Sequence, residues 1–155
     1  MKLMDFIVAD AIVAELAAAD RDGALRELVT SLATAGALPS DAVDDVVAAL
    51  IKREQNGSTG FGKGVAVPHV KHPKVAKMAG TVGRSVNGID FAALDNQPVY
   101  SVVLLLSPDS QPQQHLQAMN SIFSNLQKDM FRKFLRQSET REAIVDLLDE
   151  ADAGK

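Results

Sequence analysis

The sequence contains no cysteine, no tryptophan and only one tyrosine among its 155 residues. The lack of cysteine excludes disulfide bonds, thiolate metal sites and cysteine nucleophiles. Because only six phenylalanines accompany the tyrosine, the core is expected to consist mainly of Val, Leu, Ile and Ala. The content of 46% hydrophobic and 23% charged residues is otherwise that of one globular domain of ordinary size.

The chain also lacks a basic surface signature and any long apolar run. Its formal net charge is −4 and it has no dense stretch of Lys or Arg, which argues against nucleic acid as the main partner. The longest apolar stretch, Val102 to Leu106, is far too short to span a bilayer. Residues 1–5 lack the pattern of a signal peptide. We therefore expect a cytoplasmic protein with no direct membrane insertion.

The chain begins with helical periodicity and becomes β-rich in its middle part. Apolar spacing predicts two helices, one capped by Asp22 and one capped by Ser40. A strand is expected over 78–86, ended by an Asn87-Gly88 turn. The near-continuous apolar run over 99–106 predicts a central strand covered on both faces.

From Gln113 onward the pattern is helical again, with further helices around Phe131 and over 143–148. Helices before and after a β-rich middle predict an α/β single domain, with a central mixed β-sheet flanked by helices on both faces. We expect the domain to cover 1–150 and the small, polar tail 151–155 to fray.

The chemistry-bearing residues concentrate between Arg53 and His69. Four glycines lie within residues 57–64, which predicts a shaped loop whose backbone N–H groups can converge on an anion. Ser58 and Thr59 add hydroxyl groups, and Arg53 adds a forked cation, so a phosphoryl group is the expected ligand. The loop is not a nucleotide-binding P-loop, because a glycine follows its lysine where that motif needs a hydroxyl.

His69 follows this loop and could act as a nucleophile. A neutral imidazole has one unprotonated nitrogen that can attack phosphorus. A metal site shared with His72 is not expected, because Pro73 prevents a helix and no carboxylate is placed nearby. No cofactor or metal is needed for this chemistry.

Structural readings stay open for each of these side chains. His69 could be a turn histidine satisfied by the backbone, and Arg53 could complement a helix dipole. Ser58 and Thr59 could shape the turn, and His115 could face solvent at the start of a helix.

The run Arg53-Glu54 followed by Gly57 to His69 resembles the signature of the fructose/mannitol-type enzyme IIA of the bacterial sugar phosphotransferase system, including its nitrogen-related regulatory branch. The likeness continues through Asn87 to Phe91, Leu104 to Pro108 and His115-Leu116. It covers roughly residues 25–148. Lys71 departs from the family, in which many members have Arg at this place.

The resemblance implies a phosphocarrier and assigns the roles of its residues. His69 is then the phosphoryl acceptor, through Nε2, while Arg53 faces the phosphoryl group and His115 is a neighbouring hydrogen-bonding partner. Ser58 and Thr59 line the site. The resemblance implies an HPr-like carrier protein as donor and a IIB domain as acceptor in phosphoenolpyruvate-dependent sugar uptake.

Two other functions are compatible with the same residues. With no fused IIB or membrane segment in the sequence, the chain could be a stand-alone nitrogen-related regulator that binds target proteins according to its phosphorylation state. It could also be a binding module whose histidine is not phosphorylated.

Overall fold

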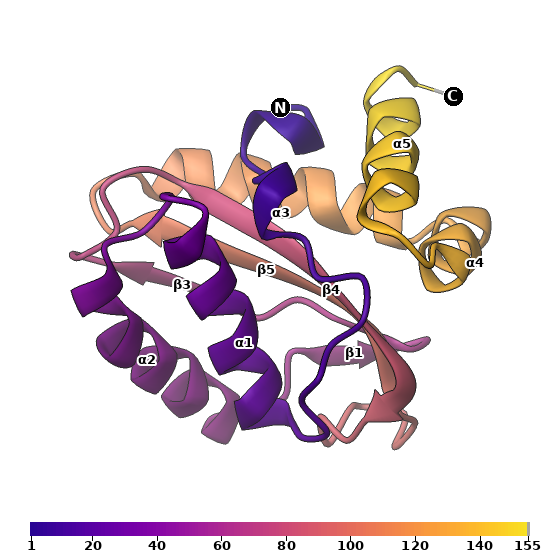
Figure 1. Cartoon of the computed structure of the whole chain (residues 1–155), viewed down its shortest axis with the longest axis horizontal. Coiled ribbons are helices and arrows are strands. Elements are labelled where there is room, and N and C mark those ends of the chain that lie inside the picture. The colour runs from indigo at the N-terminus through magenta and orange to yellow at the C-terminus, as the bar shows by residue number, and fades with distance from the viewer. Residues whose placement is uncertain (155) are drawn as a thin grey trace.

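A five-stranded mixed sheet lies between two layers of helices in the computed structural model, which describes residues 1–154 (Figure 1). The strands are β1 (Gly60–Gly62), β2 (Val65–Ala66), β3 (His69–His72), β4 (Ala79–Ile89) and β5 (Val99–Pro108). The helices are α1 (Arg21–Thr34), α2 (Val43–Gln55), α3 (Pro112–Leu126), α4 (Asp129–Gln137) and α5 (Arg141–Asp152), with short 3-10 turns η1 (Leu3–Asp5), η2 (Ala9–Ala11) and η3 (Ser40–Ala42). The α/β fold expected from the sequence is confirmed.

Strand β5 is the centre of the sheet, as its apolar run predicts. It pairs with β4 in antiparallel fashion on one side and with β2 and β3 in parallel on the other. Strands β2 and β3 are two sections of one line, interrupted at Val67 and Pro68, so that His69 opens the second section. Proline has no backbone N–H to donate, which agrees with the interruption at Pro68.

The prediction that β4 ends at an Asn87-Gly88 turn is wrong. The strand continues to Ile89, and its register with β5 shifts between Arg84 and Ile89. Gly88 has φ +87°, a conformation that other residues rarely adopt, so the Asn-Gly pair serves an irregularity within the strand instead of a hairpin turn.

Both predicted helix caps differ from those in the structure. The carboxylate of Asp20 accepts a 2.7 Å hydrogen bond from the backbone N–H of Gly23, so Asp20 caps α1 and Asp22 lies in the first turn. Ser40 begins η3 and gives no side-chain cap to α2, which starts at Val43. The spacing of apolar residues predicts which face of a helix is buried, but it does not define the first residue of the helix to better than one or two positions.

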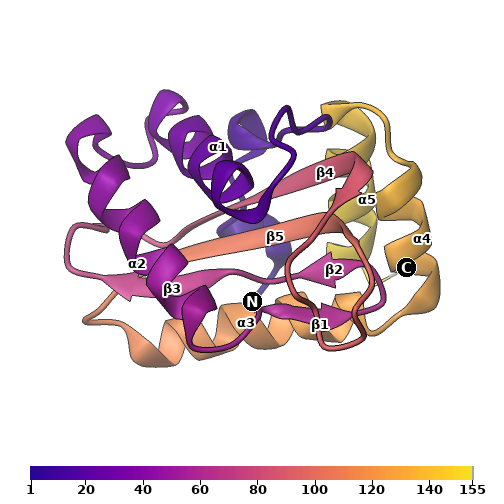
Figure 2. The same cartoon turned by 90° about the horizontal axis from the view of Figure 1, so that it is seen from below.

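Helices cover both faces of the sheet (Figures 1 and 2), and a hydrophobic core lies on each face. Along β5, Leu104 and Leu106 pack toward α1 and α2, whereas Val103 and Leu105 pack toward α3, α4 and α5. Alternate residues of a strand point to opposite faces, so a strand buried on both sides must be apolar throughout. This arrangement fixes which side of the sheet each residue of β3 faces.

Hydrogen bonds link the N-terminal turn η1 to the last helix, α5. The carboxylate of Asp152 accepts hydrogen bonds from the backbone N–H groups of Leu3, at 2.6 Å, and Met4, at 2.9 Å. Helix α5 thus continues two residues beyond the expected domain boundary at 150. Fraying of the segment 151–155 stays a prediction, and Lys155 lies outside the described residues. No helix within residues 1–154 is long and apolar enough to cross a membrane.

Candidate functional site

Two histidines from distant parts of the chain lie side by side. His69 begins β3 and is paired in register with Leu105, which faces the α3 side of the sheet. His115 lies in the first turn of α3. The centroids of the two imidazole rings are 5.6 Å apart and the ring planes are tilted by 44°. The structure thus brings together the two histidines singled out in the sequence.

One hydrogen bond determines which ring nitrogen of His69 carries its proton. Nδ1 of His69 lies 2.7 Å from the backbone carbonyl oxygen of Val67. Since a carbonyl oxygen can only accept, Nδ1 must be the protonated nitrogen that donates this bond. Nε2 then holds the free lone pair, and it has no hydrogen-bond partner among residues 1–154. The exposed lone pair makes Nε2 the nucleophilic atom of the ring.

Both rings are held in the neutral form. Burial is the main cause that lowers the pKa of His69, and the positive charges of Arg53 and Lys71 lower it further, against the opposing effects of the Val67 carbonyl and Glu54. For His115, burial first and then His69 and Lys71 lower the pKa to about 4. A neutral imidazole at pH 7 is the form that can attack phosphorus.

Arg53 lies in the last turn of α2 and reaches the glycine-rich loop. Its Nη1 donates a 2.7 Å hydrogen bond to the carbonyl oxygen of Gly57, and its charge acts on the pKa of His69. The guanidinium has five N–H donors, so this bond leaves others free. The position at the C-terminal end of α2 also agrees with the dipole interpretation, and the two roles are compatible.

The hydroxyl groups of Ser58 and Thr59 are engaged within the loop. Ser58 Oγ donates to the carbonyl oxygen of Phe91 at 2.5 Å and accepts from the N–H of Gly60 at 2.9 Å. The buried Thr59 donates its hydroxyl to the carboxylate of Glu54 and its N–H to the same group at 3.1 Å. Contact of either hydroxyl with a phosphoryl group stays a prediction and would require these bonds to exchange.

Several backbone N–H groups of the glycine-rich loop bind partners within the chain, and convergence of the others on an anion stays a prediction. The last part of the loop is a small antiparallel hairpin of β1 and β2. The N–H of Gly57 donates to the carbonyl of Glu54 at 3.1 Å, and the N–H of Lys63 donates to the carboxylate of Asp95 at 3.0 Å. Together with Thr59 and Gly60, four N–H groups of the loop serve its own folding.

Three residues near the histidines have roles that the sequence alone did not assign. Glu54, only 4% exposed, fastens the loop to α2 through Thr59. Ser107, fully buried on β5, places its Oγ 2.7 Å from Nδ1 of His115. Lys71 lies two residues after His69 on β3, hence on the same face of the strand, and its charge acts on both imidazoles. If a strand had been predicted over residues 69–72, the alternation of side chains along it would have placed Lys71 on the same face as His69.

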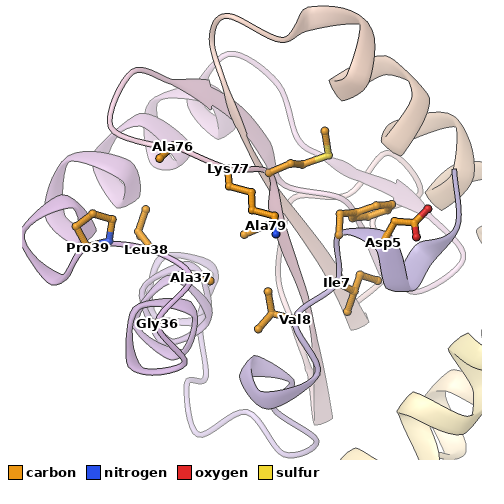
Figure 3. Close-up of a pocket in the computed structure, with 12 residues that line it drawn as sticks. Asp5, Ile7, Val8, Gly36, Ala37, Leu38, Pro39, Ala76, Lys77 and Ala79 are labelled. Atoms are coloured by element: carbon orange, nitrogen blue, oxygen red, sulfur yellow. The ribbon is translucent and has the colours of Figure 1, made fainter.

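One hollow of the structure lies away from the histidines. It has a volume of about 650 Å³ and lies between the N-terminal segment, the turn after α1 and the start of β4 (Figure 3). Ala79 in this hollow and Val70 beside His69 pair with the same residue, Leu106, from opposite sides of β5. The hollow is thus two strand spacings, about 10 Å, away from β3. Asp5 and Lys77 are the charged side chains that line it.

Residues 5–151 match the protein family described as "Phosphoenolpyruvate-dependent sugar phosphotransferase system, EIIA 2". A nitrogen regulatory protein of Bradyrhizobium diazoefficiens is 36% identical over 148 residues, which cover 96% of this chain and 95% of that protein. The fructose-specific EIIABC component of Bacillus subtilis is 30% identical over 152 residues, which cover 98% of this chain but only 24% of that longer protein.

Solved structures show the same fold. The nitrogen regulatory protein IIA-Ntr of Neisseria meningitidis superimposes with a TM-score of 0.83 at 25% identity, covering 93% of this chain and 97% of that one. Enzyme IIAMTL of Escherichia coli, in its complex with phosphorylated enzyme IIBMTL, gives a TM-score of 0.76 at 20% identity and covers 96% and 97% of the two chains.

Proposed function

Since the chain belongs to the EIIA type 2 family of the phosphoenolpyruvate-dependent sugar phosphotransferase system, we propose that it carries a phosphoryl group on Nε2 of His69. The family resemblance stated from the sequence is thereby confirmed, and a phosphocarrier role follows for the family in general. The residues and partners of this chain are the subject of the proposal.

The observation that carries the proposal is the hydrogen bond from Nδ1–H of His69 to the carbonyl of Val67. This bond presents the unprotonated Nε2 outward, beside a second neutral histidine and a guanidinium. A buried, fully paired His69 would not allow the chemistry. The ring is instead half-buried at the start of a strand.

In the proposed step, the lone pair of His69 Nε2 attacks the phosphorus atom of a phosphohistidine on a donor protein. A new N–P bond forms while the donor's N–P bond breaks, and the released electron pair returns to the donor's imidazole. His69 keeps its Nδ1 proton, so the phosphorylated ring carries a positive charge that the Val67 carbonyl stabilises. Arg53 and His115 orient and stabilise the equatorial oxygens, since positioning and charge stabilisation dominate phosphoryl transfer.

The proposed donor is an HPr-like carrier, and the proposed acceptor is a IIB domain in sugar uptake. The solved complex of a IIA protein with a phosphorylated IIB partner supports such an acceptor for this fold. The transfer is proposed to occur in the cytoplasm. Because the fructose-specific relative is several times longer than this chain, its transport activity as a whole cannot be assigned to these residues.

A regulatory role is the second candidate, supported by the relative in Bradyrhizobium diazoefficiens that matches over nearly its whole length. In this role the phosphoryl group on His69 acts as a switch, since it adds about −1.5 to −2 charges to the surface around the site. Target binding would then differ between the phosphorylated and unphosphorylated forms.

The site is tested by incubating the protein with a labelled, histidine-phosphorylated HPr-like carrier and following acid-labile, base-stable label. Wild type and His115→Ala should take label, the latter more slowly, and His69→Ala should take none. Label that persists on His69→Ala but disappears in His115→Ala would reverse the assignment of the two histidines. No label on wild type with a competent carrier would support the binding-module alternative.

The acceptor is tested in a second step with the labelled protein. Transfer of label to a fructose-type IIB domain supports the sugar route. Retention of label in the presence of that domain, together with target binding that changes on phosphorylation, supports regulation.

A further inference from the structure

A second hollow, of about 510 Å³, is lined by the β1–β2 turn and helix α4. Figures 1 and 2 show where these two elements lie in the fold. Four cations and one carboxylate line the hollow, together with a glutamine: Lys63, Asp129, Arg132, Lys133, Arg136 and Gln137. We call these six residues the basic hollow. Such a concentration of positive charge is notable in a chain whose net charge is −4.

Most of this positive charge is not neutralised by the protein. Among residues 1–154, Arg132 is paired with Asp129, whereas no ion pair is recorded for Lys63, Lys133 or Arg136. Elsewhere on the surface, Arg26 and Lys74 each meet a carboxylate of α2. Mutual repulsion between like charges in a concave site destabilises the folded chain, and a bound anion would remove that repulsion.

Several of these groups are held in place before any ligand arrives. The guanidinium carbon of Arg136 lies 3.6 Å from the centroid of the Tyr100 ring, which fixes the plane of its N–H donors. Nη1 of Arg132 donates a 2.6 Å hydrogen bond to the carbonyl oxygen of Leu126. Arginine side chains that are already oriented lose less conformational entropy when they bind an oxyanion.

Lys63 enters the hollow from an unusual backbone conformation. It has φ +60°, in the left-handed region that is unfavourable for a residue with a Cβ, and a glycine stands on each side of it. Its N–H is held by the carboxylate of Asp95 at 3.0 Å. A lysine at a position that favours glycine is consistent with a function for its ammonium group.

The basic hollow is separate from the two histidines. Val65, two residues after Lys63, pairs with Ser101, whereas His69 pairs with Leu105. The four residues of β5 between these levels correspond to about 13 Å. A ligand in the basic hollow would thus bind independently of the phosphoryl group on His69.

We propose that the basic hollow binds a small, multiply charged phosphate compound, such as a polyphosphate or a phosphate ester. Its volume lies within the range of about 300–1,000 Å³ typical of small-molecule sites. Guanidinium and ammonium groups from two elements converge on it, which suits the several oxygens of a phosphate compound. An acidic protein partner would instead require a surface of about 800 Å² on this chain.

The test uses inorganic pyrophosphate as the probe, with isothermal titration calorimetry and amide chemical shifts of the whole chain. Binding at millimolar or lower concentration is expected, with the largest shifts at Lys63 and along α4, and the affinity should fall as salt is added. His69→Ala should bind the probe as wild type does, which separates this site from the phosphoryl site.

Single variants Lys63→Gln and Arg136→Gln should each weaken binding by at least about tenfold, as expected for the loss of a charged hydrogen bond. Lys77→Gln, which removes a cation from the hollow of Figure 3, is the matched control and should leave binding unchanged. Circular dichroism checks that each variant is folded. Absence of pyrophosphate binding at low salt, equal binding by the folded variants, or binding of poly-glutamate but not of pyrophosphate would each overturn the proposal.

Discussion

At the scale of single residues, the two neighbouring histidines differ in what holds their Nδ1 atoms. His69 is fixed by a carbonyl, which dictates a protonated Nδ1 and a free Nε2. His115 meets the hydroxyl of Ser107, which can donate or accept. The hydroxyl therefore allows His115 to present either a lone pair or an N–H at Nε2, and the proposed hydrogen bond to a phosphoryl oxygen would use the N–H form.

The pKa of His115 is the first prediction at this scale. An NMR titration should find a midpoint at about 4, because burial first, and then the neighbouring His69 and Lys71, disfavour the imidazolium form of His115. In His69→Ala the midpoint should rise toward the ordinary value of about 6.5, since one of these causes is removed. A wild-type midpoint near 6.5 would contradict the structure around this ring.

The same shift has a consequence for stability, with a sign that can be checked. The unfolded chain takes up the proton of His115 near pH 6.5, whereas the folded chain does so only near pH 4. The contribution of His115 to stability is therefore complete above about pH 6.5 and is lost as the pH falls toward 4. Urea denaturation at several pH values between 6.5 and 4 should show that the free energy of unfolding falls more steeply with falling pH in wild type than in His115→Gln.

Arg53 gives the second prediction. Arg53→Ala should slow phosphoryl transfer by about tenfold to a hundredfold, because a charged donor near the transferred group is lost while the fold is kept. Arg53→Lys keeps the positive charge but lacks the forked N–H donors, so its transfer rate should lie between those of wild type and Arg53→Ala. A transfer rate in Arg53→Ala equal to that of wild type would remove Arg53 from the site.

The sequence predicts which residues belong to the candidate site, but it does not predict the hydrogen bonds of their side chains. Residues 53–69 predict a phosphoryl site, and the resemblance pairs His69 with His115. The tautomer of His69 depends on the carbonyl two residues earlier, and the engagement of Thr59 depends on a buried carboxylate. Both follow from three-dimensional packing, and residue types alone leave them open.

At the scale of elements, helix α1 packs closely on β4. A Cβ added to Gly83 would lie 2.8 Å from Leu28 and 3.1 Å from Leu16. Glycine at this position allows the helix and the N-terminal segment to approach the strand, and the apolar side chains of both then fill the core.

Gly83→Ala should therefore destabilise the fold by about 1–3 kcal/mol through overpacking. Gly36→Ala is the matched control, because its Cβ would meet nothing within 4 Å and only its φ of +83° opposes the change, at about 1–2 kcal/mol. Chemical denaturation measures both. Gly83→Ala should shift the NMR signals of the core side chains, whereas Gly36→Ala should leave them unchanged. Shifts of the core signals in Gly36→Ala and none in Gly83→Ala would contradict this packing.

Elements with one strong pattern are predicted well, and those with ambiguous signals are not. The apolar run of β5 has one interpretation, which is confirmed. An Asn-Gly pair fits either a hairpin turn or a strand irregularity, and Asn87-Gly88 takes the second because β4 remains paired up to Ile89. Asp20 and Asp22 are both suitable caps, and only the start of α1 decides between them.

At the scale of the whole molecule, sequence patterns predict neither the order of the strands in the sheet nor the hydrogen bonds between the two ends of the chain. Residues 7 and 13 extend the sheet beyond β4 through isolated bridges, and Asp152 holds the backbone of η1. Contacts between residues so far apart in the sequence leave no periodic signal. The layered α/β class was accessible because it depends on the order of the elements.

Asp152→Ala tests this joining of the ends. Loss of the carboxylate leaves the N–H groups of Leu3 and Met4 without their partner and should cost about 0.5–2 kcal/mol, as the loss of a helix cap does. Hydrogen exchange should accelerate in η1 and α5 while β5 stays protected. Unchanged exchange in both ends would show that they are not coupled through Asp152.

The most direct measurement of the central claim is the atom that carries the phosphoryl group. The protein, labelled with ¹⁵N-histidine, is phosphorylated by a histidine-phosphorylated HPr-like carrier and examined by long-range ¹H–¹⁵N and ³¹P NMR. The account predicts coupling of phosphorus to Nε2 of His69, with the proton retained on Nδ1. Coupling to Nδ1, or to a nitrogen of His115, would contradict it.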